Sequence, residues 1–61
     1  MDMVKRMPKP GEKVHIYCME GEPHYAGREG TVKCIDSLGQ IHGTWGGCAL
    51  WDSDDFVVLE E

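Results

Sequence analysis

The sequence is short of basic residues, which most nucleic-acid-binding domains need. Six lysines and arginines stand against eleven aspartates and glutamates, and the net charge at pH 7 is −5. Nucleic-acid binding draws most of its affinity from the neutralisation of phosphates, so an acidic domain starts at a disadvantage. We therefore do not expect nucleic acid as the main partner.

Long apolar runs are also missing. No run approaches the ~20 residues of a membrane span, and Met1 to Arg6 lack the apolar core of a secretory leader. We expect a cytoplasmic protein with reduced thiols that does not associate with membranes.

The cysteines lack the spacing of a metal site. There are three of them and no Cys-x-x-Cys pair, whereas zinc needs about four converging ligands, often from close pairs. We expect the three thiols to be small apolar core residues, and we expect no metal and no cofactor. A catalytic cysteine would need exposure and an adjacent base, so we expect no enzymatic activity. The inward-facing set predicted here is Cys18, Cys34 and Cys48.

What the sequence does contain is alternation of the kind that strands show. The 61 residues are enough for one small domain, and no stretch has helical periodicity of useful length. Residues 1–10 carry two prolines and are predicted as an N-terminal arm without a strand, and residues 11–61 as an all-β barrel domain. Inside it we predict a meander of five strands, a long first loop over 20–29 and a single-turn element over 52–55. The predicted strands cover residues 13–19, 31–35, 40–45, 48–51 and 56–59.

Two glycine-containing turns predict the register of the central strands. A four-residue turn over residues 36–39 should place Cys34 opposite Ile41 and Lys33 opposite His42. A two-residue turn at Gly46-Gly47 should place Trp45 opposite Cys48, Gly43 opposite Leu50 and His42 opposite Trp51. The predicted inner face then holds Trp45 and, in mid-strand, Gly43, whose missing side chain leaves room for a neighbour or lets a small barrel bend. The outer face holds a cross-strand row of Lys33, His42 and Trp51.

Most of the chain carries a series of short motifs, namely Gly11-x-x-Val14, Gly27-x-x-Gly30-Thr31-Val32, Ile35-Asp36-x-x-Gly39-x-Ile41, Trp45 and Asp55-Phe56-x-Val58-Leu59. Together these motifs resemble an SH3-like barrel. They also resemble a family of short bacterial and phage-associated proteins known only as a domain of unknown function. More distantly the chain is similar to KOW and Tudor-type barrels, although the basic loop typical of KOW domains is absent. The resemblance implies a fold and a bacterial, phage or mobile-element setting, and it implies no activity.

An apolar-aromatic patch on the outer face is the predicted binding site, because exposed patches of this kind tend to mark contact sites. Its candidate residues are Tyr17, Tyr25, Lys33, His42 and Trp51. The alternative is that residues 1–7 fold back over Trp51 and cover it.

We predict a non-enzymatic module that binds a protein or peptide. Nearby acidic residues, Glu20, Glu22 and Asp52, favour a basic partner. Weak self-association is a further expectation. The alternative function is a KOW-like nucleic-acid-binding module, which would have to use the six basic residues and base stacking on Tyr17 or Tyr25.

Overall fold

The computed structural model describes residues 2–19, 21 and 23–60, and it is an all-β fold. Its elements are β1 (Asp2–Val4), β2 (Lys13–Cys18), the single 3₁₀ turn η1 (Pro23–Tyr25), β3 (Glu29–Ile35), β4 (Ile41–Gly43) and β5 (Asp55–Glu60). All strand pairs are antiparallel, and the order in the sheet is β1-β5-β2-β3-β4. The predicted small, five-stranded all-β architecture is confirmed.

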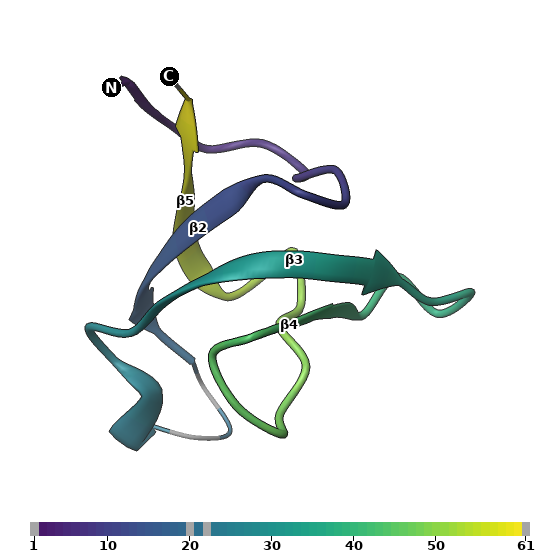
Figure 1. Ribbon diagram of the computed structural model, residues 1–61. Helices are drawn as coiled ribbons and strands as arrows, with labels where there is room; N and C mark the ends of the chain where they lie inside the picture. The colour runs from purple at the N-terminus through teal and green to yellow at the C-terminus, as the bar shows by residue number, and fades with distance from the viewer. Residues whose placement is uncertain (1, 20, 22, 61) are drawn as a thin grey trace.

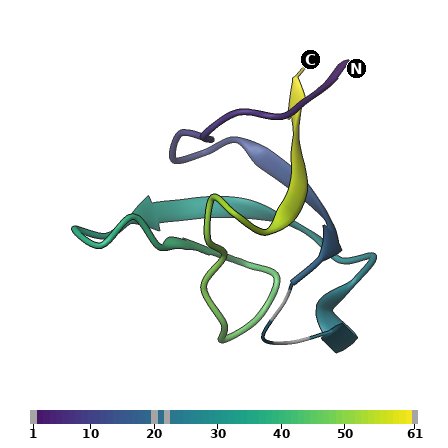
Figure 2. The same cartoon turned by 180° about the vertical axis from the view of Figure 1, so that it is seen from behind.

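The sheet is strongly bent but does not close into a complete barrel. In Figures 1 and 2, β2 and β5 run steeply while β3 and β4 lie across them, so that the sheet wraps around one core. The strands at its two ends, β1 and β4, do not pair with each other among the described residues. The fold is therefore barrel-like with an open seam.

The N-terminal arm contains a strand, which contradicts the prediction for residues 1–10. β1 pairs with β5, with Met3 opposite Leu59 and Val4 opposite Val58. The prolines that argued against a strand lie at positions 8 and 10, beyond its end, where they remove no ladder hydrogen bond. The strand is too short to show alternation, and its partner lies at the opposite end of the chain.

The core is a single cluster between the two halves of the bent sheet. Alternate residues of β2 and β5 supply much of it: Val14 and Ile16 from β2, where the sequence alternates, and Phe56 and Val58 from β5. In the part of the chain that the structure describes, the cluster of buried apolar residues is Val14, Ile16, Met19, Tyr25, Val32, Ile41, Trp45, Leu50, Phe56 and Val58.

A β-bulge in β2 moves Cys18 out of the core. The register with β5 shifts between Ile16 and Cys18, and a bulge of one residue exchanges the inner and outer faces of a strand. Cys18 is exposed and Met19 is buried in its place.

The β3–β4 hairpin is also shifted from the predicted register, here by one residue. His42 pairs with Cys34, not with Lys33, and Ile41 pairs with Ile35. The turn is one residue shorter than expected, because the Asp36 amide donates to the Gln40 carbonyl oxygen at 3.0 Å, so that residues 36 and 40 flank a turn over 37–39. The register also shifts between Val32 and Cys34, and Cys34 is exposed, which corrects its predicted place in the core.

Trp45 is the core aromatic that the sequence predicts, and it packs where two glycines leave space. A Cβ atom at Gly43 would lie 2.2 Å from the Cζ3 atom of the Trp45 ring, and one at Gly30 would lie 2.9 Å from the Trp45 amide nitrogen. The indole Nε1–H donates to the Cys48 carbonyl oxygen at 2.8 Å. Trp45 is only 3% exposed. The predicted role of Gly43 in making room for a neighbour is therefore confirmed.

The prediction of a two-residue turn at Gly46-Gly47 is wrong. The chain after β4 opens into a wider loop, and it pairs again only where Leu50 and Ile41 exchange backbone hydrogen bonds of 2.7 and 2.8 Å. Leu50 thus lies opposite Ile41 and not opposite Gly43, and the predicted strand over 48–51 is reduced to this bridge. The extra loop length accommodates Trp45, whose side chain spans the loop to reach Cys48.

Candidate partner-binding surface

The five predicted site residues do not form one patch. Their surroundings differ: Tyr17 and Trp51 are exposed by 45% and 43%, Lys33 is exposed, His42 is half-buried and Tyr25 is buried. The row of Lys33, His42 and Trp51 is absent, because both registers that would create it are shifted. The residues must therefore be considered separately.

Tyr25 is a structural residue, which corrects its assignment to the exposed patch. Only 8% of it is exposed. The Arg28 guanidinium lies 4.2 Å from the centre of its ring, and the same side chain donates from Nη1 to the Trp45 carbonyl oxygen at 2.8 Å. Gly46 packs against the tyrosine ring so closely that a Cβ there would lie 2.6 Å from the phenolic oxygen. Tyr25 thus fixes the first loop against the loop that follows β4.

His42 helps to hold the turn between β3 and β4. Its Nε2 lies 3.0 Å from Oδ2 of Asp36. The Oδ1 atom of the same carboxylate accepts from the amides of Leu38 and Gln40, each at 2.9 Å. The hydrogen bond from His42, followed by these amides, lowers the pKa of Asp36 below its usual value. The turn that the sequence predicts at Asp36 and Gly39 is therefore locked by one side chain, and Gly39 adopts a φ of 86°.

Tyr17 lies on the outer face of β2, apart from Trp51. Its ring packs edge-on against His15 with 4.8 Å between the ring centres. Its hydroxyl reaches across the sheet to Sδ of Met3, at 3.8 Å. This exposed contact joins β2 to β1 across β5.

Trp51 lies at the rim of a hollow of about 450 Å³. Met19 and Cys48 give it apolar walls, and Asp54 gives it a polar one. A second hollow, beside Cys18 and Asp55, shares Ser53 and Asp54 with the first. Among the described residues, the larger hollow, which we call the Trp51 hollow, is lined by Met19, Gly21, Cys48, Ala49, Trp51, Ser53 and Asp54.

Asp54 fixes the backbone of Trp51. Its Oδ2 atom accepts from the Trp51 amide at 2.9 Å, and its own amide donates to the Trp51 carbonyl oxygen at 3.0 Å. The predicted single-turn element before the last strand is thus a closed turn, and only 7% of Asp54 is exposed. The neighbouring Asp52 and Asp55 are exposed. The two other acidic residues expected beside the aromatics, Glu20 and Glu22, lie outside the described residues.

The alternative prediction, in which residues 1–7 cover Trp51, is wrong. β1 pairs along β5, and 43% of Trp51 remains exposed. The arm instead contacts the body through two basic side chains that the sequence did not single out. Lys5 lies over the Phe56 ring, 3.7 Å from its centre, and donates from Nζ to the Asp54 carbonyl oxygen at 2.6 Å.

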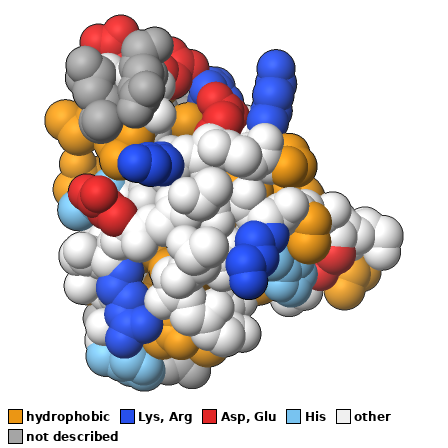
Figure 3. All heavy atoms as spheres, in the orientation of Figure 1, with side chains coloured by type: hydrophobic (Ala, Val, Ile, Leu, Met, Phe, Trp, Pro, Cys, Tyr) orange, Lys and Arg blue, Asp and Glu red, His pale blue; other side chains and the backbone are white. Residues whose placement is uncertain are grey.

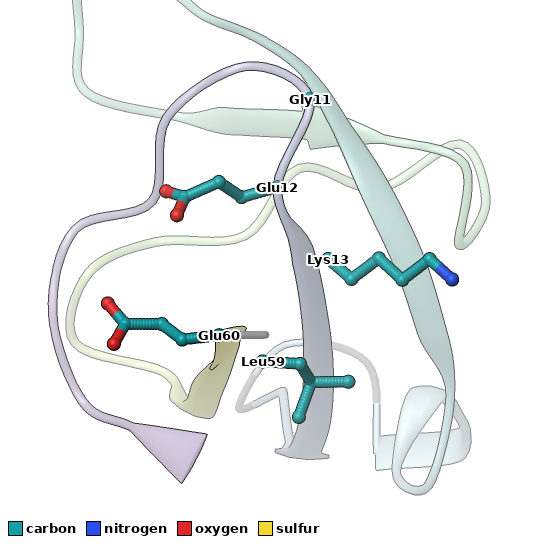
Figure 4. Close-up of a pocket in the computed structure, with 5 residues that line it drawn as sticks. All are labelled: Gly11, Glu12, Lys13, Leu59 and Glu60. Atoms are coloured by element: carbon teal, nitrogen blue, oxygen red, sulfur yellow. The ribbon is translucent and has the colours of Figure 1, made fainter. Parts of the chain in front are cut away.

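Arg6 is the second of these side chains. Its Nη2 atom is 2.6 Å from a carboxylate oxygen of Glu12 and 2.6 Å from one of Glu60. Figure 4 shows both carboxylates on the same side of a hollow of about 440 Å³, with Lys13 pointing the other way. The hydrogen bond from Arg6, followed by that from the Lys9 amide, lowers the pKa of Glu12 to about 2.

The thiols are free, but they are not all inward-facing as predicted. Cys18 and Cys34 are exposed, and Cys48 is partly buried against the core. Within residues 2–19, 21 and 23–60, no three His, Cys, Asp or Glu side chains gather closely enough to hold a metal ion. Nor does this part of the chain contain a helix that is long and apolar enough to cross a membrane.

The chain matches no family model, no curated protein and no solved structure. The resemblance to the bacterial and phage-associated family thus stays a prediction from the motifs quoted above. The assignment of a site depends on the geometry alone, and on that ground the Trp51 hollow is the strongest candidate. It combines an exposed large aromatic, a fixed backbone, an apolar wall and nearby carboxylates.

Proposed function

We propose that this protein is a non-enzymatic interaction module that binds a basic segment of a protein or peptide at the Trp51 hollow. The observation that carries the proposal is an indole that is 43% exposed although its backbone is held in a closed turn. A large aromatic in a fixed position offers contact area at a small entropic cost, which is why such residues dominate many interfaces.

The chemistry of the hollow favours a lysine or arginine beside an apolar residue. A cation over the face of Trp51 would gain roughly 0.5–1 kcal/mol at an exposed site. The exposed carboxylates of Asp52 and Asp55 attract a basic partner at longer range. The net charge of the protein, −5, is also negative and adds to this attraction. The apolar wall at Met19 and Cys48 would receive the neighbouring side chain.

The alternative, a KOW-like nucleic-acid-binding module, receives less support from the arrangement of charges. Of the six basic residues, Lys5, Arg6 and Arg28 are engaged in contacts within the chain. On the face seen in Figure 3, the Lys and Arg side chains lie apart from one another. We expect binding of mixed-sequence DNA or RNA no tighter than the weak non-specific range of about 10⁻⁴ M. The cytoplasmic location and the bacterial or phage-associated setting belong to the same proposal.

A selection from a random peptide library displayed on phage tests the function. Enriched peptides should carry Lys or Arg next to an apolar residue, and their affinity should fall as salt rises. Trp51→Ala should weaken binding of the selected peptides by about tenfold or more, as expected for an aromatic that anchors an interface.

Leu38→Ala is the matched control, because Leu38 is 73% exposed on the turn between β3 and β4 and should leave binding unchanged. Equal affinities of the two variants and the parent protein would contradict the proposed site. Micromolar, steeply salt-dependent binding of DNA or RNA would favour the alternative function.

A further inference from the structure

The N-terminal arm is bound to the body by three kinds of contact that together resemble the recognition of a basic peptide. β1 adds a strand to the edge of β5, with Met3 opposite Leu59. Lys5 places its ammonium over the Phe56 ring and on the Asp54 carbonyl oxygen. Arg6 donates to the carboxylates of Glu12 and Glu60. We call this surface the arm groove.

Charge complementarity between arm and groove is pronounced. Lys5, Arg6 and Lys9 are half of the six basic residues of the chain. Arg6 lies against an acidic end of the body, since Glu12 and Glu60 share its guanidinium. The hydrogen bond from Arg6 is the main cause that lowers the pKa of Glu12, so this contact is maintained at neutral pH.

The link between arm and body is short and exposed. Lys9, Pro10 and Gly11 are exposed, while Pro8 before them is buried with the arm. From Gly11 onward the chain is anchored, because its amide donates to the Val32 carbonyl oxygen at 2.8 Å. The link bends through a turn closed by one backbone bond of 3.1 Å from the Glu12 amide to the Lys9 carbonyl oxygen.

If that single turn opened, the arm could leave the groove of its own chain and make the same contacts in the groove of a second copy. A residue before proline prefers an extended conformation, so Lys9 can keep its conformation when the link opens. The change falls on Gly11, which has a φ of 94° in the turn and can adopt an extended conformation without a steric penalty. Exchange of an identical element between two copies is a low-cost route to a dimer, because every contact is made again in the partner.

We propose that the arm groove also takes the arm of a second copy of this chain, which gives a strand-exchanged dimer. Each arm then places its Met3 opposite Leu59 of the other copy, its Lys5 on Phe56 and its Arg6 between Glu12 and Glu60. The arm groove shares Asp54 with the Trp51 hollow, through the carbonyl oxygen that Lys5 contacts, but it does not use the Trp51 side chain, so the proposal does not depend on the proposed function.

The test uses the full chain. Equal amounts of isotope-labelled and unlabelled protein are unfolded together and refolded at the highest concentration that stays soluble, and the mass is measured by light scattering. We expect a dimer fraction that rises with concentration, and isotope-filtered nuclear Overhauser effects between Met3 of one chain and Leu59 of the other. A protein that stays monomeric throughout, or a dimer without these contacts, overturns the proposal.

Two variants make the test sharper. Deletion of Lys9 and Pro10 leaves the link too short for the arm to reach its own groove, so the mass should double at concentrations where the parent is a monomer. Met3→Pro removes a ladder donor and should abolish the dimer. Trp51→Ala is the matched control and should dimerise as the parent does. A folded deletion variant that remains monomeric overturns the proposal, and so does a Met3→Pro variant that dimerises like the parent.

Discussion

Replacing Gly43 with alanine should destabilise the protein strongly, although the change adds only a methyl group. The new Cβ would lie 2.2 Å from Cζ3 and 2.5 Å from Cη2 of the Trp45 ring, and 2.6 Å from the Thr31 carbonyl oxygen. Carbon atoms pack at about 3.5–4.0 Å, so the ring must move by roughly an ångström or more. It cannot do so freely, because its Nε1 is hydrogen-bonded to Cys48 and its surroundings are core.

The magnitude follows from overpacking, which typically costs about 1–3 kcal/mol and occasionally more. A core of this size supplies roughly 3–5 kcal/mol in total, so the variant should lose a large share of its stability. With a denaturant slope of about 1 kcal/mol per molar urea, the unfolding midpoint should fall by roughly 1–3 M.

Urea unfolding, followed by circular dichroism, measures the fall in the unfolding midpoint, with Gly47→Ala as the matched control. A Cβ at Gly47 meets nothing within 4 Å, so its midpoint should change little. Trp45→Leu combined with Gly43→Ala should cost less than the sum of the two single changes, since the smaller side chain removes the clash. Equal midpoints for Gly43→Ala and Gly47→Ala would refute the packing argument.

Further predictions concern titration, the thiols and the turn. The folded-state pKa of Glu12, about 2, lies below its usual value of 4.5. The stabilising contribution of Glu12 is therefore present above about pH 4.5 and is lost as the pH falls towards 2. Glu12→Gln should make the urea midpoint less dependent on pH in that window. With a thiol reagent under native conditions, Cys18 and Cys34 should react quickly and Cys48 slowly; three slow thiols would contradict the bulge and register described above. Asp36→Ala should cost about 1 kcal/mol or more in urea unfolding because it removes two acceptors of backbone amides, and a midpoint equal to that of the parent would exclude this role.

The parts of the fold that could be predicted are those determined by local patterns. Alternation identified β2 with its inner residues Val14 and Ile16, and a strand was expected over residues 56–59, within β5. The combination of Asp36 with Gly39 identified a turn. Trp45 was correctly placed in the core, and Gly43 was correctly interpreted as making room for a neighbour. In each case the residue types themselves carry the physical constraint.

The registers could not be predicted, because they depend on contacts between distant residues. The bulges near Cys18 and Cys34 each shift a strand by one position, and no residue near either site signals an extra residue in the ladder. β1 was missed for a related reason: its partner, β5, is at the other end of the sequence.

The same limit applies to the candidate site. Exposure of Trp51 was anticipated, but its grouping with Lys33 and His42 depended on the wrong registers. Tyr25 is buried because Arg28 and Gly46 pack against its ring, and only the folded chain brings Gly46 to it.

The packing of one indole over two glycines ties three positions together in evolution. Trp45 occupies the volume that side chains at Gly30 and Gly43 would need. A smaller residue at position 45 would leave a cavity that larger residues at the other two positions could fill. Neither glycine could be replaced by a larger residue as long as Trp45 is present. Homologous chains should therefore keep these three residues as a unit or exchange them together, which makes the triplet a sharper marker of common descent than any one of the motifs along the strands.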